Sequence, residues 1–140
     1  MALPDYIKHA AAVERATGIS SQAIANAASF TGDAIDNATN RDTYLSVELS
    51  WSYATAPTAG KTVEVHVLYA VDGTNFEELS PQSMRAVVSP LADTSSHRRL
   101  ILDAIPLAPF KFKLAVKNVD TAQTITATLK AYTWHTEVAD

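Results

Sequence analysis

The chain has 140 residues, no cysteine and a net charge of −4 at pH 7. Its length fits one domain, and 47% hydrophobic with 19% charged residues is typical of a folded protein. The lack of cysteine excludes disulfides, thiolate nucleophiles and cysteine-ligated zinc. The mild acidity argues against nucleic acid as a partner. No apolar run approaches the roughly 18 residues of a membrane-spanning helix, and nothing resembles a signal peptide.

The N-terminal segment predicts a short helix or arm. Pro4 suits a first helical turn, and Gly18 lies where glycine commonly ends a helix. A helix over residues 4–17 is too short to be stable alone. We therefore expect residues 1–18 to contact a neighbouring protein and residues 19–140 to form the main domain; packing across the end of its own domain is the alternative. The apolar contacts expected in this segment are Leu3, Tyr6, Ile7 and Val13.

Alternation of apolar and polar residues predicts an all-β protein. The clearest run is Tyr44–Tyr53, where every second residue from Leu45 is apolar. Further strands are expected at Val63–Val71, Met84–Val88, Arg99–Ala104, Phe110–Val116 and Ile125–Trp134, with a weak one within residues 23–30. Short strands separated by turns favour an antiparallel β-sandwich, jelly-roll-like in connection. Its expected core contains Val47, Leu49, Trp51, Val65, Val67, Phe112 and Leu114.

Residues with catalytic or metal-binding chemistry form no recognisable set. The histidines lack the spacing of a zinc site, and His66 is expected in solvent or at an interface; only an encounter with His135 across neighbouring strands would make a metal site. Glu77 and Glu78 are adjacent in a loop, so their carboxylates point apart. Asp33–Asp42 is rich in Asp and Asn, as in a structural turn, and matches no calcium loop. We expect no enzyme activity, cofactor or metal.

Two groups of residues are candidates for contact with another molecule. The large aromatics Tyr132 and Trp134 fall on the polar side of their strand, where they are either covered by another element or exposed as a contact patch. The second group is a set of cations expected to line one sheet face, either for solubility or to meet an acidic surface. Its members are Lys111, Lys113, Lys117, Arg98 and Arg99.

Several stretches of the chain resemble the small β-sandwich structural proteins of tailed bacteriophages, most of all capsid decoration (cement) proteins. The stretches are Ile35–Leu49, Ala56–Val65, Leu68–Phe76, Ile105–Asn118 and Thr128–Tyr132. The first eighteen residues carry no part of this resemblance. Similar stretches of sequence recur in phage virion proteins that occupy different places on the particle.

The resemblance implies a virion protein without catalytic residues, often trimeric, that sits on the outside of the head. Its partner would be the major capsid protein, whose subunits it ties together, and it would be assembled in the host cytoplasm. The alternative is a carbohydrate-binding or adhesive module of a head or tail fibre. In that case Tyr44, Tyr132 and Trp134 would stack on sugar rings.

The expected lack of a metal is testable. Chelation with EDTA should leave the melting temperature unchanged, because a bound ion stabilises a protein only where ligands hold it. A drop of several degrees in a thermal melt would contradict this expectation and direct attention to Asp33–Asp42.

Overall fold

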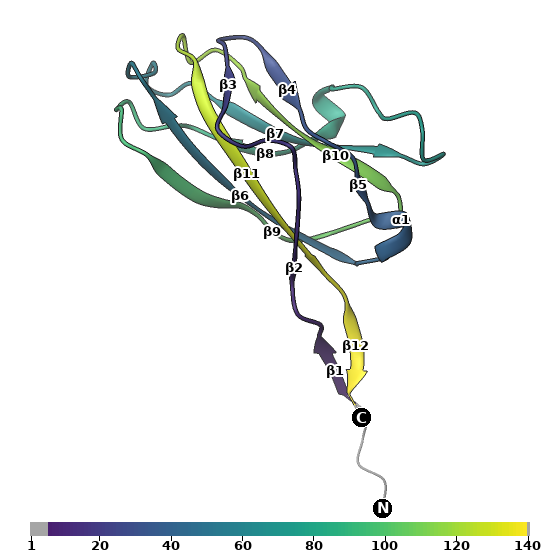
Figure 1. The fold of residues 1–140 in the computed structure, drawn as a ribbon. Helices are drawn as coiled ribbons and strands as arrows, with labels where there is room; N and C mark the ends of the chain where they lie inside the picture. The colour runs from purple at the N-terminus through teal and green to yellow at the C-terminus, as the bar shows by residue number, and fades with distance from the viewer. Residues whose placement is uncertain (1–5, 140) are drawn as a thin grey trace, which may run out of the picture.

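Two five-stranded antiparallel sheets pack face to face in a computed structural model, which describes the backbone of residues 6–139 and the side chains of residues 10–137 (Figure 1). Sheet I has the order β4-β10-β7-β8, with β5 also beside β10. Sheet II has the order β2-β11-β6-β9, with β3 also beside β11. The predicted all-β antiparallel sandwich is thereby confirmed.

The strands agree closely with the alternating runs of the sequence. Sheet I consists of β4 (Ser29–Thr31), β5 (Ile35–Asp36), β7 (Val63–Ala70), β8 (Met84–Val88) and β10 (Lys111–Asn118). Sheet II consists of β2 (Val13–Arg15), β3 (Gln22–Ile24), β6 (Tyr44–Tyr53), β9 (His97–Pro106) and β11 (Ile125–Trp134). The remaining elements are β1 (Tyr6–His9), β12 (Thr136–Ala139), the one-turn helix α1 (Asn37–Asn40) and the 3-10 turn η1 (Pro81–Ser83).

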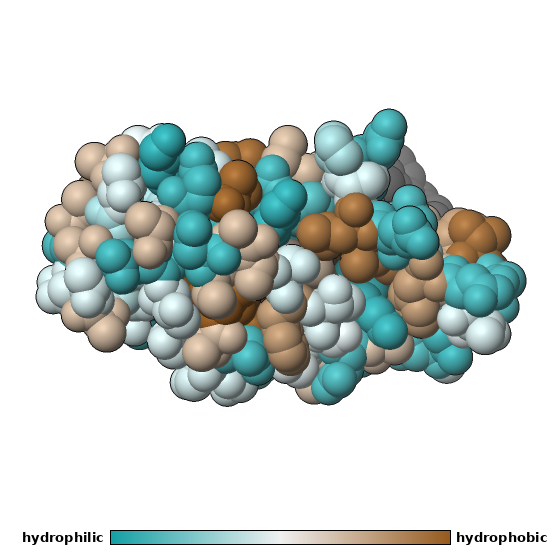
Figure 2. Space-filling view, turned by 90° about the horizontal axis from the view of Figure 1, so that it is seen from above, coloured by the Kyte–Doolittle hydropathy of each residue, from teal (hydrophilic) through white to brown (hydrophobic). Residues whose placement is uncertain are grey.

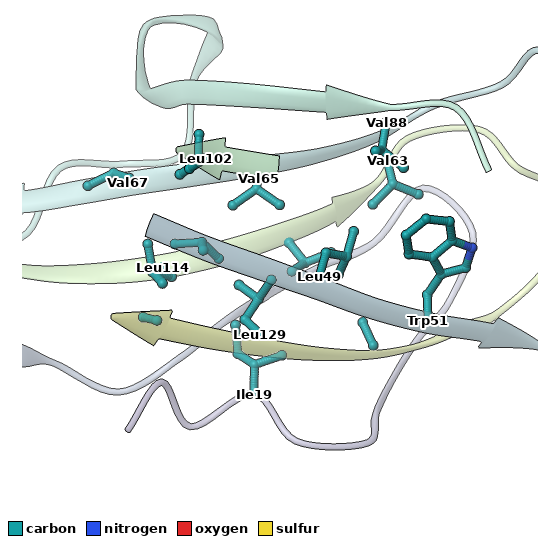
Figure 3. Packing of buried hydrophobic residues seen from close by; sticks show 14 of the residues in the cluster. Ile19, Leu49, Trp51, Val63, Val65, Val67, Val88, Leu102, Leu114 and Leu129 are labelled. Atoms are coloured by element: carbon teal, nitrogen blue, oxygen red, sulfur yellow. The ribbon is translucent and has the colours of Figure 1, made fainter. Parts of the chain in front are cut away.

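The core lies between the two sheets and is formed by the inward side chains of the long strands (Figure 3). Burial alternates without exception along β6, from Leu45 to Tyr53, as expected for a strand with one face against a core. All seven residues predicted for the core are buried. None of the helices in the described chain is long and apolar enough to cross a membrane.

Strand β7 departs from the prediction because both of its faces are buried. His66 is only 2% exposed and Leu68 is buried as well, so the expected solvent-exposed histidine is wrong. The loop after β7 covers the outer face of sheet I and is held there by backbone and side-chain contacts. Glu77 accepts a hydrogen bond from the Tyr69 amide at 2.8 Å, and Ser83 Oγ lies 2.8 Å from His66 Nδ1. This use of Glu77 is structural.

The predicted helix over residues 4–17 is wrong. Strand β1 pairs with β12, and β2 pairs with β11, both antiparallel. The apolar stripe of a helix here is thin, whereas an adjacent strand edge satisfies the backbone groups directly; tertiary contacts of this kind override helix propensity. Together β1 and β12 form a two-stranded extension, the terminal ribbon, that projects from one end of the sandwich (Figure 1).

A crossing of two chain segments closes one side of the sandwich. Thr17 and Ile19 hydrogen-bond to Leu129 in sheet II, while the Gly32 amide donates to Leu114 in sheet I. The segments touch where the Asp33 amide donates to the Thr17 carbonyl. A Cβ on Gly32 would lie 2.0 Å from that carbonyl oxygen, so this approach requires glycine. Part of the predicted arm is therefore joined to the sandwich.

A charge introduced between the sheets should unfold the domain. Val67 is 1% exposed, and Val67→Asp should cost at least about 3 kcal/mol because it buries an unpaired carboxylate. The matched control is Val87→Asp, since Val87 is 51% exposed on the neighbouring strand β8. Equal urea midpoints for the two variants would contradict the described core.

Candidate functional site

An apolar hollow lies at the base of the terminal ribbon. It has a volume of about 430 Å³ and is lined by Ala10, Ala12, Tyr44, Ala104 and Trp134. Trp134 and Tyr44 are directly opposite each other on β11 and β6, and their rings stack with centroids 5.7 Å apart and planes at 27°. Both rings remain partly exposed. An exposed aromatic pair beside small alanines is typical of a surface that contacts another molecule.

A strained residue forms one wall of the hollow. Ala104 has a φ of 51°, the left-handed region in which a Cβ costs about 1 kcal/mol. It lies at an irregularity of β9, where the register with β6 shifts between Leu45 and Val47, and its amide donates to Ser46 Oγ at 2.9 Å. Bulges and backbone strain of this kind are concentrated beside functional sites. The strain at Ala104 is a second feature of this surface beside its apolar character; Ser21, Ala27, Arg41 and Ala122 also have a positive φ.

The opposite end of the molecule has a different surface. Figure 2 shows it from above, with small, separate hydrophobic areas set among hydrophilic residues. A shallow groove of about 260 Å³ on the outer face of sheet II is lined mainly by hydroxyl groups, including those of Ser50, Ser52 and Thr126, together with Arg98. The groove is also lined by Trp51 and His97, whose ring centroids are 5.6 Å apart. Trp134 lines the hollow and is outside the lining of this groove.

A buried carboxylate binds the two residues that flank Trp134 in the chain, Thr133 and His135. Asp42 is 5% exposed and accepts hydrogen bonds from Thr133 Oγ1 at 2.6 Å, His135 Nδ1 at 3.0 Å and Arg15 Nη2 at 3.1 Å. The side chain of Asn37 binds both backbone groups of Asp42. These contacts, the Asp42 network, join β2, the loop after α1 and the junction between β11 and β12.

The Asp42 network determines the charge state of its carboxyl group. Burial raises the pKa of Asp42, but the hydrogen bonds from Thr133, His135 and Arg15, together with the charge of Arg15, outweigh burial and lower the pKa below its ordinary value. The carboxylate is therefore ionised at neutral pH. A buried anion with several donors is costly to leave unpaired, so each donor fixes the position of its own segment.

The predicted contact residues of the N-terminal segment are only partly described. Leu3 lies outside the described residues. Tyr6 and Ile7 belong to β1, opposite Ala139 and Val138. Val13 lies in β2 and is 46% exposed. Ala10 and Ala12, between these strands, line the hollow, although alanine in a polar segment gives no signal in the sequence.

The other predicted contact residues are divided between the two sheets. Lys111 lies in sheet I, whereas Tyr132 and Trp134 lie in sheet II. The expected cationic face is wrong for the same reason, because Arg98 and Arg99 belong to β9 of sheet II. Of this group the structure places Trp134 in the hollow; Tyr132 is its neighbour along β11, opposite Ser46.

One cluster has the composition of a catalytic triad but is structural. His66 lies between Ser83 Oγ and Glu64 Oε2, at 2.8 and 3.2 Å. Ser83 is buried, donates to the Ser80 carbonyl and accepts from the Ser80 amide, so its hydroxyl is occupied in η1. His135 follows β11 of sheet II, whereas His66 lies in β7 of sheet I, so these two histidines form no metal site together. Among the described residues, no three His, Asp or Glu side chains are placed to hold a metal ion.

Removal of the Asp42 charge should weaken the domain in a pH-dependent way. Because folding lowers the pKa of Asp42, its stabilising effect is present above the ordinary pKa of about 4 and is lost as the pH falls through the folded value. Asp42→Asn should lower the free energy of unfolding by about 1.5–3 kcal/mol at pH 7. Between pH 5 and pH 3, the free energy of unfolding should then fall less than it does in the unchanged chain. The control is Asp120→Asn, which removes a partly exposed pair with Lys61 and should change urea midpoints little at either pH.

No family model matches this chain, and no curated protein matches its sequence. Its function is therefore inferred from the hollow, the terminal ribbon and the Asp42 network.

Proposed function

We propose that the chain is a structural protein of a phage virion, a capsid decoration protein that binds the outer surface of the head and stabilises the shell. The observation that carries this proposal is the apolar hollow, with its stacked Tyr44 and Trp134, on a rigid two-sheet domain. The resemblance of the sequence to decoration proteins points to the same conclusion. The partner is the major capsid protein, and neither nucleic acid nor a membrane is involved.

The hollow supplies the contact that such a protein needs. Full burial of an aromatic or large aliphatic side chain stabilises by about 1.5–3 kcal/mol, and part of this gain is offset by the entropy lost on binding. One hollow therefore gives modest affinity. A symmetric shell repeats the contact many times, and a protein that binds only the assembled shell stabilises it by mass action. This logic requires no catalytic group.

The terminal ribbon and its base complete the proposed contact surface. The Ala10 amide donates to the His135 carbonyl at 2.8 Å, where the N-terminal and C-terminal segments meet. Ala10 and Ala12 therefore supply one wall of the hollow, whereas β2 and Thr17 belong to the sandwich. The chain acts, on this proposal, as a homotrimer on the exterior of the capsid after folding in the host cytoplasm.

The decisive measurement is cofractionation with virus particles. Purified protein is mixed with intact heads and, separately, with tails of the virus that encodes it, and each mixture is sedimented. Binding to heads alone is expected. Trp134→Ala should weaken this binding at least tenfold, because it removes the larger ring of the hollow; a tenfold loss corresponds to about 1.4 kcal/mol.

The matched control is Phe76→Ala, which removes a partly exposed ring packed against Lys113 on the other sheet and should leave head binding unchanged. Equal occupancy of heads by both variants would overturn the role of the hollow. Binding to tails, or to sugars on a glycan array, would instead support the adhesive module.

A further inference from the structure

Within residues 6–139, the terminal ribbon is a sheet of only two strands, β1 and β12. Among the described strands, β1 pairs only with β12, from Tyr6 opposite Ala139 to His9 opposite Thr136. Each strand therefore leaves its other edge without a partner strand in this part of the chain. A two-stranded ribbon is marginally stable in water, and a free strand edge is a template for pairing with another chain. The terminal ribbon is thus incomplete as a sheet.

The two free edges are of different kinds and complement each other. One belongs to β1 and the other to β12, and these strands already pair antiparallel within the chain. When a second terminal ribbon is placed with its β1 beside the free edge of β12, the antiparallel order continues. The central pair of the register joins Lys8 and Glu137, so the same register between chains would place a basic residue opposite an acidic one. Opposite charges across antiparallel strands are favourable.

We infer that the terminal ribbons of three or more copies of this chain join head to tail, β12 of one copy to β1 of the next, and close into an antiparallel barrel. In each contact, the free edge of β12 in one copy pairs with the free edge of β1 in the next, so the contact is heterologous. The addition of copies stops when the ring closes. A closed barrel leaves no free edge. This inference concerns the chain in solution and does not depend on binding to a capsid.

The terminal ribbon projects from one end of the sandwich (Figure 1). In a closed barrel of such ribbons, the sandwich domains of neighbouring copies would therefore lie outside the barrel.

The lack of cysteine in the chain allows a direct test by engineered disulfides. Glu137→Cys is co-expressed, in full-length chains carrying tags of different length, with Tyr6→Cys, Lys8→Cys or Ala10→Cys. These three positions cover a register shift of two residues either way. After mild oxidation, at least one combination should give a covalent dimer that carries both tags, because a disulfide forms only when the two Cα atoms lie within about 7 Å. Sedimentation of the unmodified chain should give one discrete species of three or more copies.

Each single variant alone is the matched control and should remain uncrosslinked. Covalent dimers of Glu137→Cys alone would show that the β12 edges of two copies pair with each other. A monomer or dimer in sedimentation would show that no closed ring forms. Either result overturns the inference.

Discussion

The carboxylate of Asp42 connects parts of the chain that are far apart in sequence. Its donors Arg15 and Thr133 are separated by 118 residues, and Arg15 also binds Thr133 Oγ1 directly. Because Asp42 is buried and ionised, it must keep these donors, and the donors in turn hold β2 against β11 and place the start of β12. The terminal ribbon starts next to these residues, since His135 binds Asp42 and its carbonyl accepts a hydrogen bond from the amide of Ala10, which lines the hollow. The geometry of the exposed surface therefore depends on a charge that is itself buried.

The outer faces of the two sheets differ in how far loops of the chain cover them. The long loop after β7 folds back over sheet I and buries His66 and Leu68, so that face is satisfied within the chain. Sheet II has no such cover in the described chain and presents its hydroxyl groove and the hollow to solvent. The described chain thus covers the part of sheet I around His66 and Leu68, whereas the groove and the hollow on sheet II stay open to solvent.

The long strands and the core were predictable from the sequence because period-two alternation directly reflects one buried face, as in β6. The same reasoning failed for β7, since burial of its second face comes from a loop whose path leaves no periodic signal. It failed also at residues 4–17, where proline and glycine gave helix signals but the available edges of β11 and β12 decided the structure. Trp134 was identified as a large aromatic on a polar face. Ala104 and the Asp42 network were not, because backbone strain and contacts over a hundred residues have no local signature.

The position of β11 in sheet II also has a consequence for folding during synthesis. This strand pairs with β2, β3 and β6, all of which belong to the first 53 residues, and Thr17 bonds to Leu129, which lies 112 residues later. Such loops close slowly. At roughly 5–20 residues per second, the early strands wait several seconds on the ribosome before their partner exists. Strands β3 and β4 have only three residues each, which makes them poor templates for aggregation during this delay.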